Sequence, residues 1–183
     1  MKIKPTKKTG EVVLEVNRSD ELLLTAAATA PFSVKRILVP MDFSECSKKA
    51  LQYGLALAKL HNSAITLLYV VPSPSYAAVE YGGIDYAALE AQMRADGEKE
   101  LAMLVVDEVR DKARADIAIR TGSPANEIVE VARELPADLI VVSTRGRTGL
   151  KHVLLGSVAE HVVRYAPCPV LVVREKEHDF IAN

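Results

Sequence analysis

Residues 143–157, with the sequence STRGRTGLKHVLLGS, could bind phosphate. The stretch follows an apolar run at residues 138–142 and ends at Gly156 and Ser157, where a helical pattern begins. A glycine-rich loop between a strand end and a helix start offers backbone N–H groups and the positive end of a helix dipole. Its spacing matches neither a Walker A loop nor the dinucleotide-binding G-x-G-x-x-G. The residues alone therefore leave two interpretations, a different nucleotide loop or a structural turn.

Ser157 and the loop glycines each have a purely structural alternative. Ser157 and Glu160 match the capping box S-x-x-E, which predicts that Ser157 caps the helix. The two roles can coexist, because a cap hydroxyl can also face an anion. Gly146, Gly149 and Gly156 could be turn glycines with positive φ and no ligand. Three glycines with Ser and Thr in so short a loop nevertheless favour binding.

Charged residues supply further candidates for ligand contacts. Arg145, Arg147 and Lys151 add positive charge near the loop, although each by itself also fits an exposed surface cation. Asp42 could accept hydrogen bonds from ribose hydroxyls, or could be a turn residue ahead of a helix. His152 is the histidine nearest the loop, and the four histidines do not cluster with a nucleophile motif. No catalytic residue and no metal site is predicted.

Strand and helix patterns alternate from residue 35 onward. The predicted strands cover residues 36–40, 64–71, 116–120, 137–142 and 169–173. The predicted helices cover residues 44–60, with Ser44 as the cap, 85–115, 123–135 and 157–165. Near-continuous apolar strands alternating with helices indicate a parallel sheet covered on both faces. Right-handed crossovers then give a doubly wound five-stranded α/β fold with strand order 3-2-1-4-5.

This strand order predicts where a ligand would bind. It puts a switch point between the first and fourth strands, and doubly wound sheets bind ligands at the carboxyl ends of the strands that flank such a point. The first strand ends in the sequence PMDFS at residues 40–44, and the fourth leads into the loop at residues 143–149. The two most polar strand exits therefore meet at the predicted site.

The first 34 residues do not follow this pattern. Residues 11–16 alternate partly, residues 17–20 are turn-like, and residues 21–26 could be a return strand or the start of a short helix. We expect the return strand, and therefore a hairpin. The predicted organisation is an N-terminal extension at residues 1–34, an α/β domain at 35–174 and a tail at 175–183.

The composition of the chain indicates which kinds of partner and which cellular compartment to expect. A net charge of −1 gives no reason to expect nucleic acid or a membrane surface as a partner. No apolar run approaches the roughly 20 residues that span a bilayer. Cys46 and Cys168 are far apart and form no metal or redox motif, which is typical of reduced thiols in a cytoplasmic protein.

Residues 35–174 resemble a universal stress protein domain. The segments that carry the resemblance are RILVPMDFS at 36–44, GRTGLKHVLLGSVAE at 146–160 and APCPVLVV at 166–173. The resemblance implies the five-stranded doubly wound fold. It also implies a homodimer in which the last strand pairs antiparallel with its twin through Val170, Leu171, Val172 and Val173.

The ATP-binding members of this family show the motif G-x2-G-x9-G-[ST]. Gly146, nine intervening residues and Gly156–Ser157 match its second part, while Ser143 replaces the first glycine. The resemblance implies that Asp42 and the Val70 backbone hold the ribose and adenine, and that the loop holds the phosphates, which Mg²⁺ could accompany. The implied ATP-binding residues are Pro40, Asp42, Val70, Ser143, Thr144, Arg145, Gly146, Arg147, Thr148, Gly149, Gly156, Ser157, Val158 and Ala159.

These features predict an ATP-binding universal stress protein that acts as a homodimeric regulatory or protective module in the stress response. No general base or arginine finger is evident, so ATP hydrolysis is expected to be slow at most. The alternatives are a family member that binds no nucleotide and acts through protein contacts, or a slow ATPase. An adenylate-transferring enzyme is disfavoured because the S-G-G-x-D-S and H-x-G-H signatures are missing from the sequence.

Overall fold

The computed structural model describes residues 2–5, 12–15, 33–73, 85–110, 112–144, 146 and 155–176. The chain divides into two compact units between Ser33 and Val34. The first unit contains β1 (Lys2–Pro5) and β2 (Val12–Glu15). The elements of the second unit are β3 (Arg36–Met41), α2 (Glu45–His61), β4 (Ala64–Pro72), α4 (Tyr86–Leu104), η1 (Val105–Val109), β5 (Arg114–Gly122), α5 (Pro124–Glu134), β6 (Leu139–Ser143), α6 (Ser157–Tyr165) and β7 (Val170–Val173).

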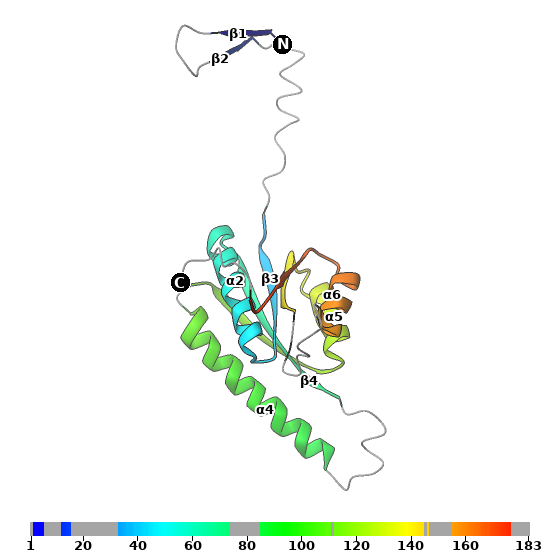
Figure 1. Ribbon diagram of the computed structural model, residues 1–183. Coiled ribbons are helices and arrows are strands. Elements are labelled where there is room, and N and C mark those ends of the chain that lie inside the picture. The colour runs from blue at the N-terminus through cyan, green and yellow to red at the C-terminus, as the bar shows by residue number, and fades with distance from the viewer. Residues whose placement is uncertain are drawn as a thin grey trace. The chain divides into compact units, whose positions relative to one another are not determined.

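The second unit is built on a five-stranded sheet in the order β5-β4-β3-β6-β7. Figure 1 shows α2 and α4 on one side of this sheet and α5 and α6 on the other. Every neighbouring pair of strands in it is parallel. Numbered along the chain, this is the order 3-2-1-4-5, so the predicted doubly wound α/β fold is confirmed. The longest ladder joins β4 to β5 over their full length, from Ala64 opposite Arg114 to Pro72 opposite Gly122.

Alternate residues of the strands feed two separate cores. On one face, Ile37, Val39 and Met41 of β3 pack with residues of α2 and α4. On the other face, Leu38 of β3 packs with residues of α5 and α6, including the fully buried Val162. Both faces of the sheet are therefore apolar, as a sheet covered by helices on both sides requires. No helix among the described residues has the length and apolar character needed to cross a bilayer.

At the amino-terminal ends of the strands, Asp138 joins the start of β6 to the start of β3. Its carboxylate oxygen Oδ2 accepts hydrogen bonds from the backbone N–H groups of Lys35 and Arg36, each at 2.8 Å. The Asp138 N–H in turn donates to the Arg36 carbonyl at 2.9 Å. The starts of β3 and β6 are thereby joined, and this fixes the register in which the two strands run toward their carboxyl ends.

The predicted helix at residues 85–115 is wrong at its end. The α-helix ends at Leu104 and continues as one π-helical turn, in which the Arg110 N–H donates to the Val105 carbonyl at 2.8 Å. Strand β5 then begins at Arg114, because pairing with Ala64 draws residues 114 and 115 into the ladder. Helical periodicity in a sequence does not reveal such a competing strand partner.

The N-terminal extension contains an antiparallel strand pair that involves one of the predicted strands. Strand β2, at Val12–Glu15, matches the strand expected at residues 11–16, but it pairs antiparallel with β1, and Lys2 lies opposite Glu15. Residues 21–26, which we expected to supply the partner, lie outside the described residues. The alternating pattern at residues 11–16 therefore predicted a strand correctly, while its pairing with residues 21–26 stays a prediction.

Candidate functional site

The predicted switch point lies between β3 and β6. These two strands are parallel neighbours with Leu38 opposite Ile140, whereas β4 lies on the other side of β3. Continuing this register to the strand ends brings Met41 level with Ser143. The polar residues that follow, Asp42 after β3 and Thr144 after β6, therefore leave the sheet side by side at its carboxyl edge, where doubly wound sheets bind ligands.

The exit of β3 is held by a chain of three hydrogen bonds. The Asp42 carboxylate oxygen Oδ1 accepts from the Ser44 N–H at 3.1 Å and from the Ser44 hydroxyl at 2.6 Å. The Ser44 hydroxyl oxygen accepts from the Ser47 N–H at 3.2 Å, so Ser44 is the predicted cap of α2. Asp42 is thus a turn residue ahead of the helix, and the turn fixes the orientation of its carboxylate.

Phe43, between these two residues, has an unusual backbone conformation. Its φ of 63° lies in the left-handed region, which costs a bulky residue of the order of 1–3 kcal/mol. The other non-glycine residue with positive φ in the described part of the chain is Asn62, at the C-cap of α2, where asparagine is tolerated. No local signal in the sequence predicts this conformation for Phe43.

Gly146 brings the loop after β6 against the exit of β3. A Cβ atom added to Gly146 would lie 2.6 Å from the Asp42 carboxylate oxygen Oδ2, well inside van der Waals contact. A side chain at position 146 would therefore displace the Asp42 carboxylate or the loop backbone. The sequence proposed both residues as ligand contacts, and the structure places them together.

The two ends of the glycine-rich loop are joined to each other. The Gly156 N–H donates to the Thr144 carbonyl at 2.8 Å, and the Thr144 N–H donates to the Val173 carbonyl at 2.9 Å. A Cβ atom on Gly156 would lie 2.9 Å from the Thr144 carbonyl oxygen, so glycine is needed here for close approach. The N-terminus of α6 is thereby held next to the exit of β6.

The predicted capping box at the start of α6 does not form. Gly156 occupies the cap position, Ser157 is the first helical residue, and no side chain caps the helix. The Glu160 carboxylate instead pairs with Arg164 on the next turn at 3.0 Å. The hydrogen bond from the Gly156 N–H to the Thr144 carbonyl explains why the capping box is missing, because it makes Gly156, and not Ser157, the residue at the cap position. The first-turn N–H groups, at Ser157, Val158 and Ala159, have no acceptor within the helix.

The other predicted site residues lie either in the strands β3, β4 and β6 or outside the described residues. Ser143 ends β6 with an ordinary strand conformation, since it is not among the positive-φ residues. Pro40 lies in β3 opposite Leu68, and Val70 lies buried in the exit half of β4. The loop candidates Arg145, Arg147, Thr148 and Gly149, with Lys151 and His152, lie outside the described residues.

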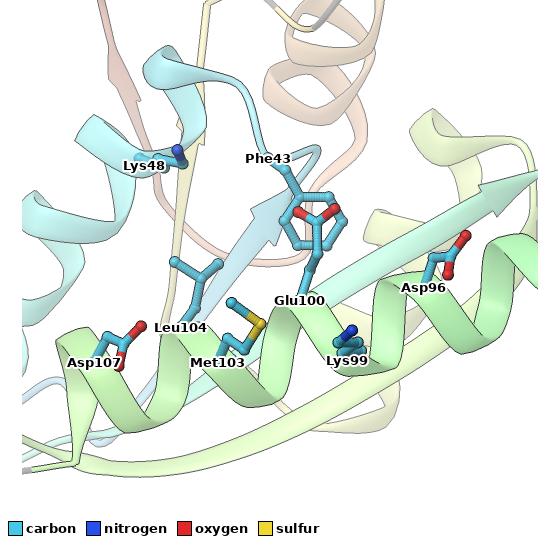
Figure 2. A pocket seen from close by; sticks show the side chains of 8 residues that line it. All are labelled: Phe43, Lys48, Asp96, Lys99, Glu100, Met103, Leu104 and Asp107. Atoms are coloured by element: carbon cyan, nitrogen blue, oxygen red, sulfur yellow. The ribbon is translucent and has the colours of Figure 1, made fainter.

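A groove of about 480 Å³ lies beside this region, between the start of α2 and α4. Figure 2 shows Phe43 reaching from the turn before α2 toward α4. The rim carries charges of both signs, and the residues that line it are Phe43, Lys48, Asp96, Lys99, Glu100, Met103, Leu104 and Asp107. None of the predicted nucleotide-binding residues lines this groove, so it is distinct from the switch point.

Fold and site together define a doubly wound α/β protein whose switch point brings together a carboxylate, the two ends of a glycine-rich loop and a helix N-terminus. The model of the universal stress protein family matches residues 33–174. The chain belongs to this family, and the resemblance predicted from its sequence is confirmed.

Individual relatives agree with this assignment. Universal stress protein MJ0531 of Methanocaldococcus jannaschii is 34% identical over 145 residues, which cover 79% of this chain and 85% of that protein. The solved structure of protein MJ0577 superposes with a TM-score of 0.71 at 31% identity and covers 80% of this chain and 100% of that one. A universal stress protein solved in complex with cAMP has a TM-score of 0.56 at 25% identity and covers 79% of this chain and 100% of that one.

Proposed function

We propose that this protein binds ATP at the switch point between β3 and β6, and that it acts in the cytoplasm as a homodimeric regulatory or protective module of the stress response. The observation that carries the proposal is the approach of Gly146 to the Asp42 carboxylate. It brings the carboxylate that we propose for the ribose next to the start of the loop that we propose for the phosphates, although the two lie far apart in the sequence.

The phosphates would bind between the loop and α6. The first-turn N–H groups of α6 and the positive end of its dipole favour an anion at this position. The cap position is occupied by Gly156, so a phosphate oxygen could approach the backbone without meeting a capping side chain. More phosphates would contact more of these N–H groups, and ATP should therefore bind more tightly than AMP.

The nucleoside would bind against the exits of β3 and β4. Asp42 would accept hydrogen bonds from ribose hydroxyls, while Val70 would contact the base through its backbone. A related universal stress protein was solved with cAMP, an adenine nucleotide with a ribose and a phosphate. That complex supports a nucleotide as the ligand class here, and the loop length and α6 favour a triphosphate.

Titration calorimetry on protein freed of ligand tests the site directly. The Gly146→Ala variant puts a methyl group against Asp42 and should weaken ATP binding by at least about tenfold, or about 1.4 kcal/mol. The matched control is Gly54→Ala in α2, where the added methyl meets only the Val39 side chain. Undetectable heat with millimolar ATP and the unmodified protein would refute ATP binding and favour a member that acts through protein contacts.

The serine in place of the first motif glycine gives a second test. Ser143 already has a strand conformation that any residue adopts, so glycine should offer no backbone advantage. We expect Ser143→Gly to leave ATP affinity within about threefold of the unmodified protein, a difference of about 0.7 kcal/mol. A much larger loss would mean that the serine hydroxyl itself contacts the nucleotide.

A further inference from the structure

We propose that Phe43 and Tyr69 position the Asp42 carboxylate for the nucleotide, and that Gly97 of α4 sets the position of this aromatic pair. The role toward a nucleotide rests on the proposed function, whereas the packing that positions Asp42 does not. The inference makes α4, which supplies no predicted ligand contact, a determinant of nucleotide affinity.

Gly97 of α4 lies directly against the side chain of Tyr69. A Cβ atom at Gly97 would lie 2.2 Å from Cδ1 and 2.4 Å from Cε1 of the Tyr69 ring. Tyr69 is 7% exposed and lies at the exit end of β4, opposite Met41 of β3. The ring thus occupies the space that a side chain on α4 would need, and any residue other than glycine would displace it.

Phe43 connects this ring to the turn that carries Asp42. The rings of Phe43 and Tyr69 have centroids 5.0 Å apart at an interplanar angle of 42°, a favourable tilted arrangement. A bulky residue keeps a left-handed backbone only where its surroundings hold it there. Packing against Tyr69 is such a restraint on Phe43, so it also fixes the direction of the adjacent Asp42.

Two residues of the turn, Phe43 and Ser44, therefore hold Asp42 in place. Ser44 holds the carboxylate oxygen Oδ1 through two hydrogen bonds, and Phe43 fixes the backbone between them. The other oxygen, Oδ2, faces Gly146 of the loop. The Phe43 ring also lines the groove between α2 and α4 in Figure 2, so a shift of α4 acts on the same turn from outside the nucleotide site.

The first test compares Gly97→Ala with Gly54→Ala, two identical exchanges at buried helical glycines. We expect Gly97→Ala to weaken ATP binding by about tenfold and Gly54→Ala to change it by less than about twofold. The loss should be smaller for 2′,3′-dideoxy-ATP, because this analogue lacks the hydroxyls that a displaced Asp42 fails to bind. Equal losses for both nucleotides would show a general disturbance of the fold and overturn the proposal.

A second readout does not depend on nucleotide binding. In 1H–15N spectra of the ligand-free protein, Gly97→Ala should shift the amide signals of Asp42, Ser44 and Gly146, and Gly54→Ala should leave them in place. Unshifted signals would overturn the positioning role even if ATP binds. Shifted signals without ATP binding by the unmodified protein would instead support the positioning role and refute only the proposed function.

Phe43→Leu covers the case in which Gly97→Ala does not fold. Leucine preserves apolar bulk but removes the ring that packs on Tyr69, so the same amide shifts and the same smaller loss for the dideoxy analogue are expected. Binding of ATP with unchanged affinity by a folded Phe43→Leu variant would contradict the proposal.

Discussion

The two edge strands of the sheet, β5 and β7, differ in length and in composition. β5 is nine residues long and exposes the charged side chains of Arg114, Asp116 and Arg120, whereas β7 is four residues long with the sequence VLVV. Charged side chains on an edge strand discourage pairing with another chain. The comparison indicates that only β7 has the composition of an edge that accepts a partner strand.

Contacts from the covering helices strengthen this difference. Arg120 forms an ion pair with Glu134 of α5, and the Thr121 hydroxyl donates to the Glu90 carboxylate of α4 at 3.1 Å. Side chains from helices on both faces of the sheet thus reach the β5 edge. At β7 a side chain of a covering helix also makes a contact, since the buried Cys46 thiol of α2 points to the Val173 carbonyl at 3.8 Å. This carbonyl also accepts the Thr144 N–H, so the contact does not cover the outward side of the strand.

The hydrogen bonds of β7 show which of its backbone groups face the open edge. The Ile140 N–H donates to the Pro169 carbonyl at 3.1 Å and the Thr144 N–H to the Val173 carbonyl at 2.9 Å. Because backbone groups alternate in direction along a strand, Leu171 also faces β6, while Val170 and Val172 face outward. A dimer through β7 would therefore use the backbone groups of Val170 and Val172.

Leu171→Pro should be the most disruptive change, because it acts on folding itself and not only on dimerisation. Proline removes an N–H that faces β6 and leaves a buried carbonyl without its donor, at a cost of about 1–3 kcal/mol. Urea denaturation should show a lower free energy of unfolding at every protein concentration. An unchanged unfolding midpoint would contradict the orientation deduced for β7.

Val172→Pro should break the proposed dimer and largely spare the monomer. It removes an outward-facing N–H, and we expect dimer affinity to fall by about a hundredfold, or about 2.7 kcal/mol. Light scattering at micromolar concentration should report a monomer. The matched control is Ile117→Pro on β5, where the bond from the Ser73 N–H to the Gly122 carbonyl makes residue 117 face outward. Loss of the dimer in this control instead would place the interface at β5.

Val170→Lys should have a smaller effect, because it gives β7 one of the charged side chains that protect β5. The lysine stem can lie along the strand while its ammonium stays in water, so the fold should tolerate it. The approach of two like charges across a symmetric interface should weaken the dimer by about tenfold, or about 1.4 kcal/mol. The loss should shrink as salt is added, since salt screens exposed charges. A salt-independent loss would point to steric exclusion.

Much of the fold follows from local features of the sequence. Apolar runs and helical periodicity predicted, in order, the five strands and the four α-helices that the structure describes in residues 34–176, and Ser44 was predicted correctly as a cap. Errors arose where a distant segment competed for the same residues. Arg114 pairs with Ala64 in the sheet and is therefore not part of the predicted helix. The hydrogen bond from Gly156 to Thr144 puts Gly156 at the cap position that was expected for Ser157.

The sequence by itself determined which residues are candidates for the site, because glycines, an aspartate and a helix start can be recognised from type and spacing. Only the tertiary structure decided which of them meet. Gly146 and Asp42 are far apart in the chain, as are Gly97 and Tyr69, yet each pair approaches within a distance that admits no side chain on the glycine. Close approach depends on how helices and loops pack on the sheet, and local periodicity carries no information about that packing.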